Sequence, residues 1–93
     1  MTAPSVQLIS AILADDSSKI KSLLERGVVN VNDRLFSELP PLLRAALYGK
    51  PRALKALLDC GADRNITDKR GLTALQLAQK YNHPEIVEIL LQN

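Results

Sequence analysis

An internal repeat constrains the fold of this 93-residue chain more than any other feature of its sequence. Residues in the middle of the chain recur 33 positions later as the same side chain or a similar one. The matched positions are Leu42 and Leu75, Ala45 and Ala78, Tyr48 and Tyr81, Pro51 and Pro84, Leu54 and Val87, and Leu57-Leu58 and Leu90-Leu91. A period of this size is typical of proteins that stack small, similar units into a row.

A third unit precedes these two. The segment Leu23–Gly27 matches Leu57–Gly61 at an offset of 34, and Asn32 matches Asn65 at an offset of 33. The first unit therefore has one extra residue between Gly27 and Asn32. The chain thus contains three units, none of which is long enough to bury its apolar face alone.

The pattern within each unit predicts two short helices joined by a turn. In the last unit Thr73 is a natural N-cap, because its hydroxyl can accept a hydrogen bond from the first helical turn. Asn82, like Gly49 in the middle unit, tolerates the left-handed conformation that ends a helix. Pro84 suits the first position of the next helix, where its missing amide proton costs nothing. The apolar residues that follow at helical spacing are Ile86, Val87, Leu90 and Leu91.

The composition is that of a globular protein without a strong electrostatic field. Hydrophobic residues make up 46% of the chain and charged residues 24%, and the net charge is +2. This balance argues against nucleic acid and anionic membranes as partners. No apolar run approaches the roughly 18 residues of a spanning helix, and Met1-Thr2-Ala3-Pro4 lacks the pattern of a signal peptide. With a single cysteine, Cys60, these features favour a cytoplasmic or nuclear protein.

Two segments carry a resemblance to a known family. Residues Asp68–Ala78, followed by Asn82–Val87 and Leu90-Leu91, resemble an ankyrin repeat, and so does the segment Leu57–Asn65. The resemblance implies an all-α ankyrin-repeat solenoid of three stacked helix–turn–helix units with short hairpin-like finger loops. It also implies one ankyrin-repeat domain at 1–93, with an N-terminal capping repeat at 1–33, a central repeat at 34–66 and a C-terminal capping repeat at 67–93.

The chain departs from the family's Thr-Pro-Leu-His motif in the second and third units. The motif becomes Pro40-Pro41-Leu42-Leu43 in the middle unit and Thr73-Ala74-Leu75-Gln76 in the last one, so the histidine is lost twice. The middle unit also loses the hydroxyl group that would cap its first helix. We therefore expect that helix to begin without a side-chain cap.

Residues with catalytic or metal-binding chemistry are few and scattered. The single histidine, His83, and Cys60 lie 23 residues apart, and nothing arranges the contact that a reactive pair needs. We expect His83 to help close the turn between two helices. Asp15 and Asp16 are better explained by structure, since Asp16 or Ser17 can cap the following helix. The sequence thus predicts no catalytic, cofactor-binding or metal-binding residue, no small-molecule substrate and no enzyme activity.

The strongest charge feature is a basic cluster in the middle unit. Its members are Arg44, Lys50, Arg52 and Lys55. Arg52 and Lys55 are three residues apart on one helix and share a face, and Glu85 and Glu88 take the same positions in the last unit. We interpret these residues as a solvated outer face. A nucleic-acid interface would carry interleaved aromatic residues and a larger positive excess.

The resemblance also implies where a partner binds, namely on the finger loops and the ends of the first helices. In this sequence those places carry apolar and aromatic residues with basic residues around them, as protein-binding hot spots do. The predicted partner-binding residues are Phe36, Leu39, Arg44, Leu47, Tyr48, Lys69, Arg70, Leu72, Lys80 and Tyr81. The basic rim suggests a partner with an acidic segment. Phe36 and Tyr48 have a second interpretation, which stays open: they pack between neighbouring repeats.

We therefore expect a protein–protein interaction module that acts as an adaptor or as a stoichiometric regulator of another protein. The alternative is a small structural subunit of a larger complex that docks through the end of the stack. Ile86 and Ile89 stand where the middle unit has Ala53 and Ala56, so their exposure at the last unit would mark such a contact. On this interpretation the chain is a monomer or a weak dimer formed through Ile86 and Ile89.

Overall fold

The structure, a computed structural model, describes residues 3–34 and 39–92 and consists there of six helices without a strand. The helices are α1 (Pro4–Leu13), α2 (Ser17–Glu25), α3 (Pro41–Tyr48), α4 (Pro51–Asp59), α5 (Ala74–Lys80) and α6 (Pro84–Gln92). They pack as pairs, α1 with α2, α3 with α4 and α5 with α6, so each unit of the sequence is one helical pair. The predicted all-helical repeat architecture is confirmed.

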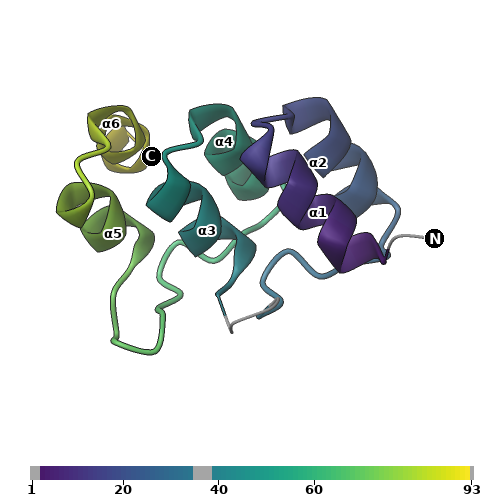
Figure 1. Ribbon diagram of the computed structural model, residues 1–93, viewed down its shortest axis with the longest axis horizontal. Coiled ribbons are helices and arrows are strands. Elements are labelled where there is room, and N and C mark those ends of the chain that lie inside the picture. Colours follow the sequence, from purple (N-terminus) through teal and green to yellow (C-terminus); the bar gives the residue numbers. More distant parts are fainter. Residues whose placement is uncertain (1–2, 35–38, 93) are drawn as a thin grey trace.

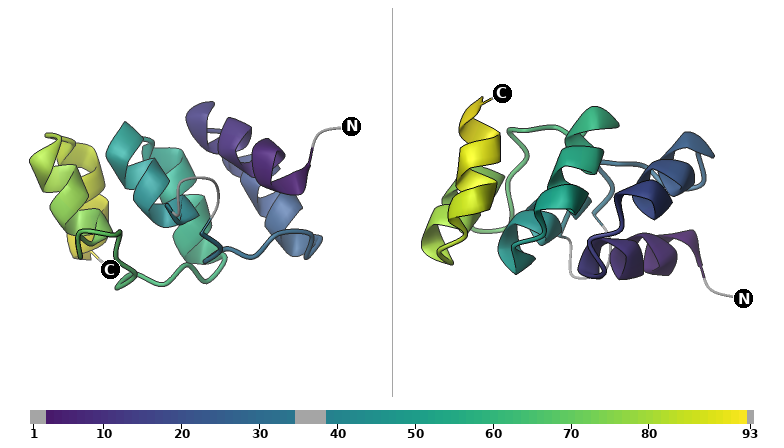
Figure 2. Two further views of the ribbon diagram at one scale, coloured as in Figure 1. Left: turned by 60° about the horizontal axis from the view of Figure 1, so that its bottom comes forward. Right: turned by 90° about the horizontal axis from the view of Figure 1, so that it is seen from above.

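The three pairs stand side by side in a single row (Figure 1). α3 packs between α1 and α5, and α4 packs between α2 and α6. The described parts of the loops that join the pairs run along one edge of the row (Figure 2). The molecule measures 36 × 25 × 20 Å and is longest along the row, with α1 and α2 at one end and α5 and α6 at the other.

Two helices, α2 and α5, begin at side-chain caps that the sequence predicts. The Asp16 side chain accepts a 3.1 Å hydrogen bond from the backbone amide of Lys19 at the start of α2. Thr73 and Gln76 form a reciprocal capping box at the start of α5. α3 begins after Pro40 without a side-chain cap, as expected. A cap of this kind stabilises a protein by about 1 kcal/mol, so α3 depends more heavily on its packing.

A residue with left-handed backbone geometry links the two helices of every unit. The φ angles of Asp15, Gly49 and Asn82 are 55°, 68° and 58°, and the three residues hold equivalent positions. The predictions for Gly49 and Asn82 are confirmed. Asp15 is their counterpart in the first unit, and aspartate tolerates this conformation better than most residues.

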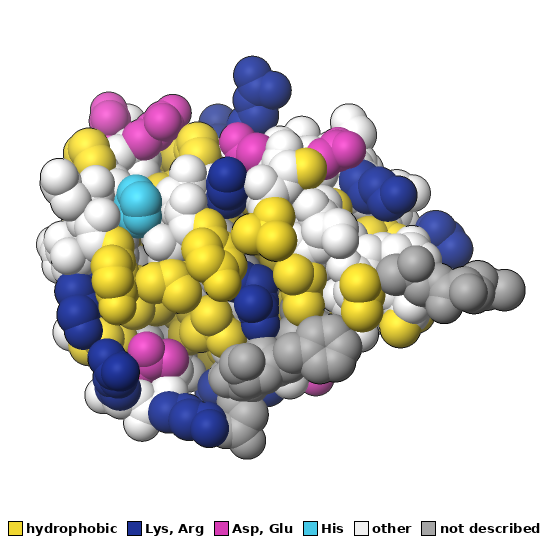
Figure 3. Space-filling view, viewed as in Figure 1, with side chains coloured by type: hydrophobic (Ala, Val, Ile, Leu, Met, Phe, Trp, Pro, Cys, Tyr) yellow, Lys and Arg dark blue, Asp and Glu magenta, His cyan; other side chains and the backbone are white. Residues whose placement is uncertain are grey.

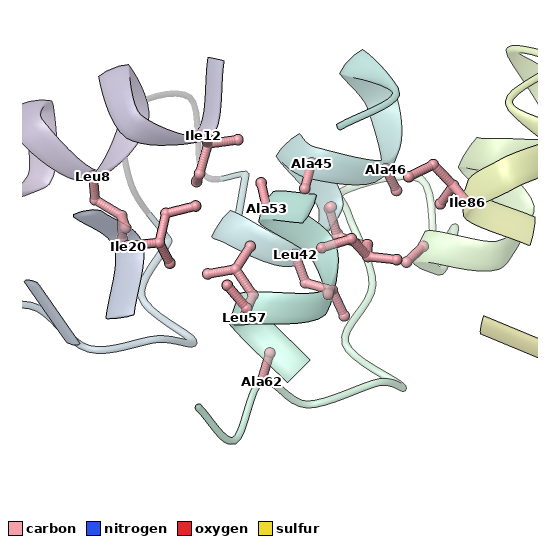
Figure 4. Close-up of a cluster of buried hydrophobic side chains, with 14 of the residues drawn as sticks. Leu8, Ile12, Ile20, Leu42, Ala45, Ala46, Ala53, Leu57, Ala62 and Ile86 are labelled. Atoms are coloured by element: carbon pink, nitrogen blue, oxygen red, sulfur yellow. The ribbon is translucent and has the colours of Figure 1, made fainter. Parts of the chain in front are cut away.

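The hydrophobic core lies largely between the helical pairs (Figure 4). Its members are Leu8, Ala11, Ile12, Ile20, Leu23, Leu42, Leu43, Ala45, Ala46, Ala53, Leu54, Ala56, Leu57, Ala62, Ala74, Leu77, Ala78 and Ile86. Full burial of each large apolar side chain contributes about 1.5–3 kcal/mol. The stack therefore gains its stability from contacts that no single pair can make.

The structure corrects the expectation that Ile86 and Ile89 are exposed at the end of the row. Ile86 is 1% exposed and points from α6 toward Ala46 of the second unit (Figure 4). Ile89 is half-buried and packs against the core. These bulky side chains serve the interface between the second and third units, so a dimer contact through them is wrong.

Asp15 makes a contact between units that its sequence position did not reveal. Its Oδ1 atom accepts a 2.7 Å hydrogen bond from the backbone amide of Ala53, in the first turn of α4. α4 has no side-chain cap at Lys50 and no acidic residue in its first turn. Asp15 supplies both the acceptor and the negative charge that a helix N-terminus favours. The first unit thereby caps a helix of the second.

Asp15→Ala is expected to lower the free energy of unfolding by about 1–3 kcal/mol, because it leaves a partly buried amide without its acceptor and because alanine tolerates the left-handed backbone less well than aspartate does. Urea unfolding followed by circular dichroism measures this loss. Asp15→Asn keeps an acceptor oxygen and tolerates the left-handed geometry, so it should cost clearly less. Equal losses for the two variants would contradict the capping role.

His83 makes a similar contact between the second and third units. Its Nε2 atom lies 3.0 Å from the carbonyl oxygen of Leu47. Its ring also covers Gly49, where a Cβ atom would come within 2.6 Å of the imidazole. Gly49 therefore meets two demands, a left-handed backbone and the close approach of a ring. The turn against which His83 packs belongs to the preceding unit.

Gly49→Ala is expected to cost more than the roughly 1–2 kcal/mol of a left-handed alanine, because the new Cβ atom must also displace the His83 ring. In a His83→Ala background the same substitution should cost only the backbone part. A double-mutant cycle measured by urea unfolding separates the two contributions. Zero coupling energy would mean that the ring moves aside without cost.

Candidate protein-binding site

A hollow of about 250 Å³ opens beside α3 and α5 and the finger loop, residues 68–72, that precedes α5. The residues that line it are Leu39, Leu47, Asp68, Lys69, Arg70, Leu72, Leu77, Lys80 and Tyr81. On this face of the molecule, hydrophobic side chains gather in the middle, over α3 and α5, with basic side chains beside them toward the finger loop (Figure 3). The hollow therefore combines an apolar interior with a charged edge.

The apolar part of the hollow comes from segments that are distant in the sequence. Leu39 precedes α3, Leu47 lies near the end of α3, Leu72 belongs to the finger loop, and Leu77 lies on α5. Leu77 is buried, while the other three leucines are half-buried. The packing of α5 against α3 brings these leucines together. Their exposed apolar surface is available for burial by a partner.

Asp68 holds the finger loop in shape. Its Oδ1 atom accepts hydrogen bonds from the backbone amides of Arg70 at 2.8 Å and Leu72 at 2.9 Å. Its own amide donates to the carbonyl oxygen of Leu72 at 3.0 Å. Gly71 completes the tip with a φ of 81°. Lys69 and Arg70, the two basic residues of the loop, therefore lie on a turn that several hydrogen bonds hold in shape.

The rim of the hollow is basic and partly aromatic. Lys69, Arg70 and Lys80 are exposed, and so is Tyr81. The Nζ atom of Lys80 lies 5.6 Å from the centre of the Tyr81 ring, within range of a cation–π interaction. Among the described lining residues, Asp68 is the one acidic group, and two backbone amides already donate to its carboxylate. The rim therefore presents a net positive charge.

Most of the predicted partner-binding residues line this hollow. They are Leu39, Leu47, Lys69, Arg70, Leu72, Lys80 and Tyr81. Tyr48 is exposed but does not line the hollow, and Phe36 lies outside the described residues. Arg44 is only 8% exposed. It lies buried on α3, between α1 and α5, and not on the rim where we expected it.

Two lining residues, Asp68 and Leu77, were not predicted. The sequence did carry a signal for Asp68, because an aspartate followed by Gly71 three residues later is typical of a turn closed by its own side chain. Leu77 gave no such signal. Its position on α5 is apolar and helical, and only the neighbouring α3 decides that it faces the hollow.

Cys60 and His83 do not form a reactive pair. Cys60 follows the last residue of α4, whereas His83 packs on Gly49, just before α4 begins. They therefore lie at opposite ends of α4, which is about 14 Å long. Burial raises the pKa of the Cys60 thiol, and the nearby Glu25 raises it further. Within residues 3–34 and 39–92, no group of three or more His, Cys, Asp or Glu side chains is placed to hold a metal ion.

A row of helical pairs with an apolar hollow and a charged rim defines a helical-repeat protein of the kind that binds other proteins. The family model for ankyrin repeats, in three copies, matches residues 8–93. The chain therefore belongs to the ankyrin-repeat family, whose fold is a non-catalytic module for protein–protein interaction. In the part of the chain that the structure describes, every helix is too short to cross a membrane.

Known proteins share these repeats within longer chains. The neurogenic locus notch homolog protein 2 of Homo sapiens is 30% identical over 86 residues, which are 92% of this chain and 4% of that protein. The ankyrin repeat domain-containing protein SAT10 of Stachybotrys chartarum is 39% identical over 85 residues, 90% of this chain and 4% of its own. The ankyrin repeat protein YahD of Escherichia coli is 35% identical over 79 residues, 80% of this chain and 39% of its own. The chain thus spans less than half the length of these relatives.

Asp68→Ala is expected to loosen the finger loop while leaving the helices intact. The backbone amides of Arg70 and Leu72 lose their acceptor, so their exchange with solvent deuterium should quicken by about tenfold. Hydrogen exchange followed by nuclear magnetic resonance measures this. The amide of Leu77 in α5, which donates to the carbonyl oxygen of Thr73, is the internal control, and its exchange rate should stay the same. Unchanged exchange at Arg70 and Leu72 would show that Asp68 does not hold the loop.

Proposed function

We propose that this protein is an adaptor or stoichiometric regulator that binds an acidic segment of a partner protein in the hollow. The observation that carries the proposal is the combination, in one hollow, of leucine side chains inside and basic side chains on the rim. At protein interfaces, most of the binding energy comes from a few anchors that fill pockets and lose their water, surrounded by polar groups. The hollow has the composition that such an anchor needs.

The size of the hollow favours a side chain of a partner over a free small molecule. Its volume of about 250 Å³ lies below the roughly 300–1,000 Å³ that is common for small-molecule sites. An apolar side chain of a partner would cover Leu39, Leu47 and Leu72. The exposed ring of Tyr81 would then border the inserted side chain.

The charge on the rim favours acidic residues beside that anchor. Lys69, Arg70 and Lys80 surround the hollow, and the carboxylate of Asp68 already bonds to backbone amides. Complementary charges at the edge of an interface mainly raise the association rate and select the partner. Binding should therefore weaken as the salt concentration rises, because the screening length shortens from about 10 Å at 0.1 M to about 3 Å at 1 M.

A peptide-display selection against the intact chain tests this proposal. We expect the selected peptides to share a large apolar residue flanked by Asp or Glu. Fluorescence anisotropy then compares the parent with a Lys69→Glu, Arg70→Glu variant, which should bind about tenfold more weakly as attraction turns into repulsion. The matched control is Arg52→Glu, Lys55→Glu, two charge reversals on the exposed outer side of α4, and it should leave the affinity unchanged.

Circular dichroism confirms beforehand that both double variants keep their helices. If the selected peptides carry no acidic residue, or if the finger-loop variant binds as tightly as the parent, the hollow is not the partner site. If only the Arg52→Glu, Lys55→Glu control lost affinity, the binding site would lie on α4 instead.

A further inference from the structure

The hollow beside α3 and α5 extends from one end of these helices to the other. Arg70 and Leu72 line it from the finger loop before α5, and Lys80 is the last residue of α5. Leu39 and Leu47 line it near the start and the end of α3. α5 has seven residues, so it is about 10 Å long. An occupant that fills the hollow therefore lies along the axis of α5 over about that distance.

Basic side chains stand at both ends of this length. Arg70 is exposed on the finger loop, before α5 begins, and Lys80 is exposed where α5 ends. The Tyr81 ring, whose centre is 5.6 Å from the Nζ atom of Lys80, helps to hold that ammonium group at its end of the hollow. The carboxylate of Asp68 already accepts hydrogen bonds from two amides of the loop. An occupant therefore meets a positive charge at each end.

An extended chain matches this arrangement. In a strand every second side chain points to the same face, and residues i and i+4 are about 13 Å apart. Leu72 and Leu77, which lie between the two bases along the chain, supply apolar surface for the middle side chain. A cavity of about 150 Å³ already holds benzene, so this hollow of about 250 Å³ has room for one large side chain. Carboxylates two residues before and after it then reach toward Arg70 and Lys80.

A helix matches the hollow less well. With its side chains a helix is about 10–12 Å across, so it would stay above the hollow and insert single side chains. Helices that bind in grooves use several apolar anchors in a row, and here the bases occupy the places of the outer anchors. A short helix with one anchor is also unstable by itself. Its binding would have to supply the free energy of folding it.

We propose that the occupant of the hollow is an extended segment of a partner protein with the pattern acid-x-apolar-x-acid. One acidic residue pairs with Arg70 and the other with Lys80, so these two bases select the spacing. The inference rests on the proposed function and adds to it the conformation of the bound segment and the positions of its charges.

Three nine-residue peptides of identical composition test the spacing. Each is capped at both ends and contains a central Phe, six Ser and two Glu, which lie one, two or four residues from the Phe on both sides. Nuclear magnetic resonance titration of the intact chain gives each affinity, and the amide signals of Arg70 and Leu72 report binding in the hollow. We expect the spacing of two to bind about fivefold more tightly than the others, because it alone brings both carboxylates to the bases.

Double-mutant cycles assign each carboxylate to its base. Arg70→Gln and Lys80→Gln should each weaken binding of the spacing-two peptide by about two- to fivefold. The loss for Arg70→Gln should vanish when one Glu of the peptide is replaced by Gln, and the loss for Lys80→Gln when the other is replaced. Lys55→Gln, on the exposed outer side of α4, is the matched control and should leave the affinity unchanged. Circular dichroism checks that the variants stay folded.

Three results would overturn this inference and leave the proposed function standing. If the three peptides bind equally and all shift the signals of Arg70 and Leu72, the hollow takes an acidic segment without a fixed spacing. If the spacing of four binds most tightly, the occupant is a helix, in which residues four apart share a face. If Arg70→Gln and Lys80→Gln couple to the same Glu, the segment does not span the hollow. Absence of these shifts with all three peptides would overturn the proposed function as well.

Discussion

Each helical pair of this protein depends on its neighbour to bury its apolar face. Leu54 and Leu57 of the second unit, which has a neighbour on each side, are fully buried, whereas Val87, the equivalent of Leu54 in the third unit, is half-exposed. Each large side chain buried in this way contributes about 1.5–3 kcal/mol, in a domain whose whole stability is expected to be about 5–15 kcal/mol. The loss of two or three such contacts would unfold the row. The helices, the loops and the hollow all rely on this stacking.

Polar contacts determine how one unit sits on the next. The carboxylate of Asp15 binds an amide of α4, and His83 reaches the carbonyl oxygen of Leu47. In the loops, the amide of Asp63 donates to the side-chain oxygen of Asn32 at 2.8 Å. Apolar packing has no direction, so it allows neighbouring helices to slide. Hydrogen bonds have strict geometry, so these contacts fix how neighbouring units sit, and the contact of His83 with Leu47 holds the third unit against α3, beside the hollow.

Much of the fold could be predicted because its signals are local. Thr73 marks a helix start and Asn82 a helix end through their own backbone and nearest neighbours. The errors concern the direction in which a helix faces. Arg44 proved buried and Ile86 proved to pack between units, since the rotation of α3 and α6 is decided by helices distant in the sequence. The hollow followed the same rule: its rim was predictable from the finger loop, while the place of Leu77 in its lining depends on how α5 packs against α3.

The two ends of the described row differ in chemistry. If both ends were apolar and complementary, copies would join head to tail, and contacts of that kind that do not close into a ring form filaments. Lys19 and Ser22 remove the complementary surface at one end, while Val87 and Leu91 keep the other end apolar. The polar residues that keep the first unit in water therefore also give the row a direction.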